Sequence, residues 1–211
     1  MQDYKASTRK MWFSTFSLTL VCALVLGAGL STLGGHLIQG ASRAQDKVVE
    51  ALYPPDTPVE VVNIKVMEKL LKLGDKFDGD EEWLHHLSLK LKNVSGKYIV
   101  FVGMYLDFPE TKATGNVMAF PLSYGRNPRA SVSLSEPKRL APGEITDVAF
   151  SEQDYAKLKS FVEQRHSMGS IHKATLRITD IYFEDGTIWN NGSLMRPDPN
   201  NPHRLIPVNT P

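Results

Sequence analysis

The sequence predicts a mainly β protein, an antiparallel β-sandwich with one inserted helix, preceded by an N-terminal transmembrane or signal helix. Three observations support this: short β-rich runs alternate with turn-forming residues, a single run has helical period, and the first part of the chain is apolar and uncharged. The 211 residues suffice for one domain with a core and attachments. The expected parts are a signal anchor or signal peptide (1–44), a linker (45–58), a β-sandwich domain (59–192) and a Pro/Asn-rich C-terminal tail along the surface (193–211).

The N-terminal part is typical of a membrane element. Residues 11–42 contain no charged side chain, with Arg9 and Lys10 just before them and Arg43 just after. The run reaches the roughly 20 residues that span a bilayer, while its densest part has the length of a signal-peptide core, about 7 to 15 residues. Both interpretations export the rest of the chain. We expect an extracytoplasmic protein, either anchored by one span with a cytoplasmic N-terminus or secreted or periplasmic after cleavage near Ala44.

Small residues recur every four positions in this run, at Ala23, Gly27, Ser31 and Gly35. On a helix this spacing places them on one face, where small side chains let two membrane helices approach closely. The pattern raises one functional hypothesis, an accessory subunit of a membrane complex that packs through its N-terminal helix. Export signals are also rich in small residues without making such a contact.

The chain between this run and the middle of the domain is expected to hold a linker, a strand and a connection. Gln45 to Pro58 ends in Tyr-Pro-Pro-Asp-Thr-Pro, and such prolines stiffen a chain into an extended spacer. Val59 to Val66 is rich in β-branched residues and predicts the first strand. Leu70 to Asp80 contains two glycines and predicts a polar connection.

Two runs in the middle of the chain predict a central hairpin. Residues 83–92 alternate, with Trp83 and three leucines on one parity and mostly polar residues on the other, which is the period of a half-buried strand. Turn-forming residues follow at 93–96. Residues 97–108 are then apolar on both parities, which is typical of a strand covered on both faces.

The next elements are an irregular strand, a short strand and the helix. Residues 116–124 alternate but contain Pro121, which cannot donate to a β-ladder and so predicts an edge strand. Residues 145–150 predict a short strand. Ser151 is a good helix N-cap before acidic residues, and apolar residues with helical spacing follow, so we expect a helix over about 152–166.

The last strong signal is a hairpin. Residues 174–183 and 188–189 are β-rich and flank an Asp-Gly turn, a strong short-range hairpin signal. The inward parity changes between Ile178 and Ile181, which predicts a β-bulge.

The order of several of these segments resembles a known family. Residues 89–99, then 102–107, then Leu-Ala-Pro-Gly-Glu at 140–144 followed by Phe150, are similar to immunoglobulin-like, FxLYD-type β-sandwich domains of uncharacterised exported bacterial proteins. The ending at 181–189 is also similar to such proteins. The resemblance implies an immunoglobulin-like sandwich that serves as a binding or accessory module, and it brings no catalytic residues.

One stretch contains candidate metal ligands. Asp78, Asp80 and Glu82 alternate ahead of His86 and could hold a cation, which raises the alternative of a metal-assisted hydrolase or a cation-binding protein. The spacing does not match a twelve-residue calcium loop. His85 and His86 would point to opposite faces of the predicted strand, so they are poorly placed to share one metal ion. The simpler interpretation is a solvated acidic turn before a strand.

Composition removes several classes of function. The only cysteine, Cys22, lies in the N-terminal run, so the body has no thiol nucleophile, cysteine metal cluster or disulfide framework. The formal net charge is +1 and no basic block is present, so we expect no nucleic-acid partner, and no cofactor is expected either. Core packing explains most strand aromatics, although some could form an exposed patch; these are Tyr98, Phe101, Tyr105, Phe108, Tyr182, Phe183 and Trp189.

These patterns together favour a non-enzymatic, extracytoplasmic β-sandwich module, membrane-anchored or secreted, that mediates protein or cell-envelope interactions. Its partner is expected to be a protein or another component of the envelope, and the N-terminal helix is expected to contact the membrane.

Overall fold

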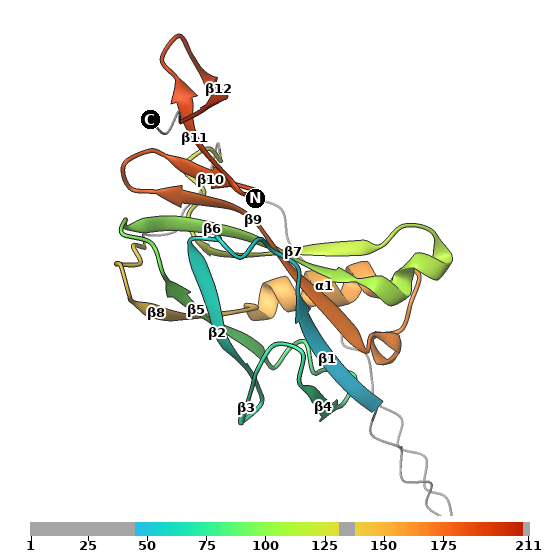
Figure 1. Cartoon of the computed structure of the whole chain (residues 1–211). Coiled ribbons are helices and arrows are strands. Elements are labelled where there is room, and N and C mark those ends of the chain that lie inside the picture. The colour runs from blue at the N-terminus through green and yellow to red at the C-terminus, as the bar shows by residue number, and fades with distance from the viewer. Residues whose placement is uncertain (1–44, 131–137, 209–211) are drawn as a thin grey trace, which may run out of the picture. The chain divides into compact units, whose positions relative to one another are not determined.

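The computed structural model describes residues 45–130 and 138–208, which form a mainly β fold of two sheets and one short helix (Figure 1). The larger sheet contains β1 (Gln45–Ala51), β4 (Lys76–Gly79), β6 (Ile99–Phe108), β7 (Met118–Gly125), β9 (Lys173–Phe183), β10 (Ile188–Asn190), β11 (Ser193–Asp198) and β12 (Asn201–Pro207). The smaller sheet contains β2 (Val59–Val66), β3 (Lys69–Leu71), β5 (Leu87–Asn93) and β8 (Ile145–Ala149), and α1 spans Glu152–Glu163.

The larger sheet is built around β9. β6 pairs antiparallel along one edge of β9, and β7 pairs with β6 beyond it. The other edge of β9 is shared: β1 pairs parallel with its first residues, and β10 pairs antiparallel with its last residues. β4 extends the sheet from β1, while β11 and β12 extend it from β10 as a projecting hairpin (Figure 1). The smaller sheet has the order β3-β2-β5-β8.

One apolar core lies between the two sheets. β5 alternates as expected, with Leu87, Leu89 and Leu91 buried, and β6 contributes an almost continuous buried run. Among the residues that the structure describes, every member of the core lies between Val49 and Trp189. The body therefore has a core of its own, as an independently folding domain needs.

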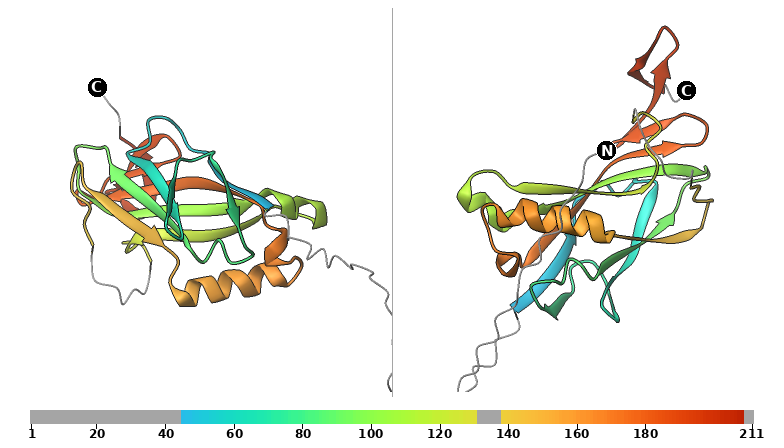
Figure 2. Two further views of the ribbon diagram at one scale, coloured as in Figure 1. Left: turned by 90° about the horizontal axis from the view of Figure 1, so that it is seen from below. Right: turned by 180° about the vertical axis from the view of Figure 1, so that it is seen from behind.

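The helix lies alongside the sheets, as the two views of Figure 2 show. The Ser151 hydroxyl accepts a hydrogen bond from the Asp154 backbone N–H at 3.1 Å, which caps the helix as predicted. The apolar face of α1 is buried through Tyr155, Leu158 and Val162. Phe120 of β7 lies with its ring centroid 6.2 Å from that of Phe161, so the helix packs beside the edge strand of the larger sheet.

Several predictions from the sequence are confirmed. The strands expected at 59–66 and 145–150, the edge strand with its proline, the helix and the last hairpin all form. The predicted strand at 97–108 is internal, between β7 and β9. The bulge is also present, because Gly103 faces Asp180 and Met104 faces Ile178, which leaves Thr179 without an opposing residue.

Three segments were expected to lack strands, and the structure corrects them. The beginning of the expected linker 45–58 is β1, which buries Val49 in the core. The expected connection at 70–80 contains the end of β3 and all of β4, and the expected tail 193–211 contains the β11–β12 hairpin. These strands are defined by backbone pairing with distant segments, which a local side-chain pattern does not reveal.

The prediction of a central hairpin at 83–108 is also wrong, because its two strands, β5 and β6, belong to different sheets. Asn93 ends β5 and is fully buried; its side-chain amide donates to the carbonyls of Lys97 and Leu140 at 2.8 and 2.9 Å. The chain therefore crosses from the smaller to the larger sheet at this residue. The strand also begins only at Leu87, since residues 81–86 form consecutive turns.

The predictions for the N-terminal run fall outside the described residues, including the helix face of Ala23, Gly27, Ser31 and Gly35. The single α-helix of the described residues, α1, is too short and too polar to cross a bilayer.

Candidate binding site

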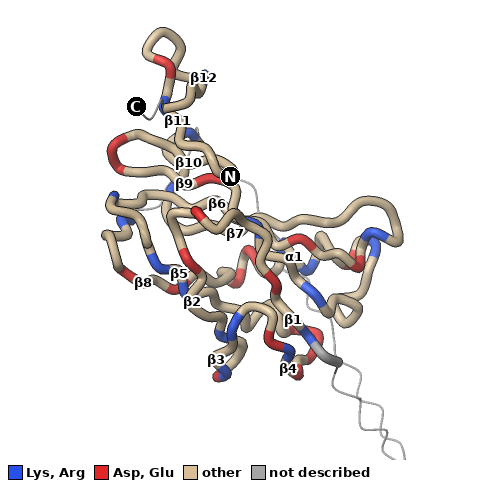
Figure 3. The backbone as a smooth tube through the Cα atoms, viewed as in Figure 1, with Lys and Arg blue, Asp and Glu red and all other residues tan. Residues whose placement is uncertain are grey.

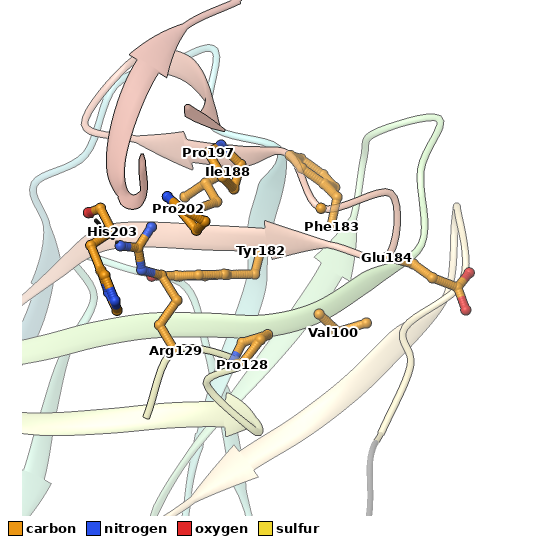
Figure 4. Close-up of a pocket in the computed structure, with 11 residues that line it drawn as sticks. Val100, Pro128, Arg129, Tyr182, Phe183, Glu184, Ile188, Pro197, Pro202 and His203 are labelled. Atoms are coloured by element: carbon orange, nitrogen blue, oxygen red, sulfur yellow. Dashed lines mark hydrogen bonds between the residues drawn. The ribbon is translucent and has the colours of Figure 1, made fainter. Parts of the chain in front are cut away.

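A cleft of about 550 Å³ lies on the larger sheet (Figure 4). The β9–β10 hairpin, the β11–β12 hairpin and the turn after β7 surround it. The lining residues are Val100, Pro128, Arg129, Tyr182, Phe183, Glu184, Gly186, Ile188, Pro197, Pro202 and His203. The volume lies within the range of small-molecule sites, roughly 300 to 1,000 Å³.

Local backbone geometry brings the β11–β12 hairpin to this place. Asn191 and Gly192 have φ values of +44° and +91° and make the tight turn between β10 and β11. Such turns need positive φ, which asparagine and glycine tolerate best. Arg129 then ties the hairpin to the turn after β7, because its Nη2 donates to the His203 carbonyl oxygen at 2.7 Å. This hydrogen bond joins two walls of the cleft.

Polar groups gather at one end of the cleft. In Figure 4 the ring of Tyr182 extends toward Arg129 and His203. Burial raises the pKa of Tyr182, nearby Asp180 raises it further, and Arg129 partly offsets both effects. The hydroxyl of Tyr182 is therefore protonated at neutral pH and is available as a hydrogen-bond donor beside the guanidinium.

Apart from Glu184 at the opposite end, the rest of the cleft is apolar. Ile188, Pro197 and Pro202 lie on the side of the β10–β12 strands (Figure 4). Phe101 of β6 packs edge-on against Tyr182, with ring centroids 5.6 Å apart, and so fixes the position of the tyrosine. An apolar body can be buried here while a polar group is held at the other end.

A smaller cavity of about 300 Å³ continues the cleft, sharing Val100 and Pro128 with it. Arg126 and Lys138 line this extension. Figure 3 shows basic and acidic residues interspersed over the strands in general, so a gathering of cations at one cavity is a local feature. Two basic side chains therefore lie beside the cleft at this extension.

Two of the residues that the sequence indicated as possible metal ligands, Asp80 and Glu82, make other interactions. Asp80 Oδ1 accepts from the Glu82 backbone N–H at 2.9 Å, which stabilises the turn. Glu82 lies 3.8 Å from Lys159 of the helix, Asp78 is an exposed residue of β4, and His86 lines an open, polar depression on the smaller sheet. Within residues 45–130 and 138–208, no three His, Cys, Asp or Glu side chains are grouped to hold a metal ion.

The two histidines do not separate as an alternating strand would require. Their ring centroids are 5.1 Å apart, because residues 81–86 form turns rather than a strand. His85 stacks on Tyr155 of α1 at 4.3 Å, and its Nε2 lies 3.0 Å from the Glu152 carboxylate. The prediction of opposite faces is therefore wrong, and His85 joins the turn to the helix.

Sequence reasoning missed a buried lysine at the start of the domain. Lys47 of β1 is 1% exposed, and its Nζ donates to the Ile171 carbonyl at 3.0 Å. Trp83 Nε1 donates to the same carbonyl at 3.0 Å, and His172 Nδ1 lies 3.4 Å from Nζ. Burial lowers the pKa of Lys47, and the charge of Glu110 partly offsets this. The shared parity of Lys47 with buried Val49 was the available signal.

The cleft itself was also missed, although Tyr182 was among the aromatics considered for an exposed patch. The other walls of the cleft come from the segment expected to be a surface tail and from a loop. The only sequence signal for them was compositional: Pro128 and the prolines within 197–207 have no obvious core role.

Comparisons with protein-family models, curated proteins and solved structures find no match to this chain.

Proposed function

We propose that this chain is a non-enzymatic, extracytoplasmic binding module, anchored or released at its N-terminus, that recognises a component of the cell envelope through the cleft between β9, β10, β11 and β12. The observation that carries the proposal is the cleft: about 550 Å³, mainly apolar, with Arg129, Tyr182 and His203 at one end. Concave apolar sites with a few convergent polar groups are typical of ligand recognition.

The chemistry of the site favours binding over catalysis. Around the cleft, Arg129 already donates to a backbone carbonyl, and Glu184 lies 2.6 Å from Arg139. These groups suit charge recognition, whereas a hydrolase needs a nucleophile or metal-bound water beside a general base. The alternative of a metal-assisted hydrolase using Asp78, Asp80, Glu82 and His86 gains no support from the geometry. The Asp80 carboxylate accepts from the Glu82 backbone N–H within the turn, and the Glu82 carboxylate lies 3.8 Å from Lys159.

Two further parts of the proposal rest on the sequence. The uncharged run at 11–42 supports export, and the segments from Leu89 to Phe150 support membership of the immunoglobulin-like family. The two-sheet architecture is compatible with that family. An accessory role in a membrane complex through Gly27 and its neighbours is a separate proposal, tested by crosslinking of the Gly27→Leu variant in membranes.

Site-specific photocrosslinking tests the proposed binding role. A photoreactive amino acid replaces Pro202 in the full-length protein, and the matched control carries it at Leu70, which is 61% exposed on the smaller sheet. Irradiation of intact cells is expected to give a discrete adduct from position 202 and none from position 70. An additional Arg129→Glu substitution is expected to remove the adduct. Equal adducts from both positions, or none from position 202, would contradict the proposal.

A further inference from the structure

We infer that the cleft selects an amphipathic anion, a ligand with an apolar chain and one carboxylate head, rather than an extended peptide. The inference rests on the proposed function, which makes the cleft the recognition site. It adds the chemical class of the ligand, and it follows from three properties of the cleft: its unpaired cations, the engagement of its acids, and its prolines.

The cations around the cleft are available. Arg129, Arg126 and Lys138 line it or its extension, and none of them forms an ion pair within the described part of the chain. Arg129 uses Nη2 for the His203 carbonyl, which leaves other N–H donors of its guanidinium for a ligand. Planar guanidinium groups bind carboxylates with two parallel hydrogen bonds, so Arg129 suits such a head group.

The acidic residues near the cleft are engaged elsewhere. Asp180 Oδ1 accepts from the Thr179 hydroxyl at 2.7 Å, and its carboxyl lies against Gly103 of β6. Glu184 lines the opposite end of the cleft, where it forms an ion pair with Arg139, and in Figure 4 its side chain points away from Arg129. Arg129 is therefore the charged side chain that lines the polar end of the cleft among the described residues, and its guanidinium complements an anion.

The walls of the cleft disfavour an extended peptide. Pro128, Pro197 and Pro202 have no backbone N–H, so these three positions offer no donor to a β-ladder. Peptide recognition by strand addition depends on such main-chain hydrogen bonds. An alkyl chain needs none of them: it can be buried against the prolines and Ile188 while its head group reaches Arg129 and Tyr182.

Decanoate, a single-chain carboxylate, is the probe for this inference. Residues 45–211 contain every core residue of the described part of the chain, so this body is used for the titration and the apolar N-terminal run is left out. Calorimetry measures affinity, and NMR amide shifts report the site. Decanoate is expected to bind at least about tenfold more tightly than decanol, its uncharged counterpart, and to shift amides of Tyr182, Phe183 and His203.

Variants separate the head group from the apolar chain. Arg129→Gln is expected to weaken decanoate about tenfold and decanol much less, since decanol loses only the contact that Arg129 makes between the two walls of the cleft. Tyr182→Phe keeps the ring and is expected to weaken decanoate a few-fold. Arg165→Gln, on another cavity beyond the end of α1, is the matched control and should change neither affinity. Equal affinity for decanoate and decanol, no loss in Arg129→Gln, or amide shifts elsewhere would overturn the inference.

A parallel titration distinguishes failure of the ligand class from failure of the proposed binding function. A short peptide with an apolar, acidic C-terminus is titrated in parallel. If the peptide binds and decanoate does not, the ligand class is wrong, while the adduct from position 202 still supports a binding module. If neither probe binds and position 202 gives no adduct, both proposals fail.

Discussion

Replacement of Asn93 is expected to uncouple the two sheets at the point where the chain crosses between them. Asn93 is fully buried at the end of β5. Its amide nitrogen donates to the carbonyls of Lys97 and Leu140 at 2.8 and 2.9 Å, and its Oδ1 accepts from the Ser95 backbone N–H and hydroxyl at 2.9 and 2.7 Å. One side chain thus holds both the crossing turn and the segment that precedes β8.

The loss in free energy of unfolding caused by Asn93→Ala can be estimated from the groups that lose their hydrogen-bond partners. The Leu140 carbonyl keeps the hydrogen bond from the Ile99 N–H at 3.0 Å. The Ser95 hydroxyl, which loses Asn93 Oδ1 as its acceptor, can donate to the Lys97 carbonyl 3.2 Å away. Two net hydrogen bonds of about 1 kcal/mol each are lost, and the Ser95 N–H loses its only acceptor among the described residues, at a further cost of about 1 kcal/mol. The expected loss in free energy of unfolding is about 3 kcal/mol.

Asn93→Asp sharpens this test. The ionised carboxylate keeps the bonds from Ser95 but places negative charge against two carbonyl oxygens in a buried site, so we expect a larger loss than in Asn93→Ala at pH 7. Urea denaturation followed by circular dichroism measures both variants, with Asn116→Ala in an exposed loop as the control, expected within about 0.5 kcal/mol of wild type. A loss below about 1 kcal/mol in Asn93→Ala would refute the reasoning.

Two further substitutions have defined outcomes. Gly125 has a φ of +70°, and an added Cβ would collide with the Val100 carbonyl oxygen, so Gly125→Ala is expected to lower the thermal midpoint by several degrees; an unchanged midpoint would contradict this. Because the pKa of Lys47 is lowered in the folded state, the unfolded chain binds its proton more tightly, and stability rises with pH between that lowered pKa and about 10.4. Lys47→Met removes this rise of stability with pH. At pH 7 its free energy of unfolding is expected to equal or exceed that of the wild type, since the Ile171 carbonyl keeps its hydrogen bond from Trp83. Urea denaturation at several pH values measures both effects, and a pH slope in the variant equal to that of the wild type would disprove the reasoning.

The sequence allowed the prediction of those elements whose signal is local. The alternation of Leu87, Leu89 and Leu91 marks β5, the serine cap and apolar spacing mark α1, and the Asp-Gly turn marks the β9–β10 hairpin. In each case the residues that define the element are neighbours along the chain, so propensity and period suffice.

The missed features depend on distant partners. β1 has little pattern of its own and becomes a strand because its backbone pairs with β9 and β4. β5 and β6 resemble a hairpin locally, but burial of Asn93 turns the chain into the second sheet instead. The cleft combines a loop near Pro128 with a hairpin near Pro202, and no sequence spacing connects the two.

The parallel pairing of β1 with β9 also sets the order in which the domain can fold. Val48 faces Lys173, about 125 residues further along the chain, so the inner edge of β1 has no partner until most of the protein has been synthesised. Closing so long a loop comes late and makes a high-contact-order topology slow to form. If the chain is exported, the body is expected to cross the membrane unfolded, and β1 can pair with β9 only after β9 has also crossed.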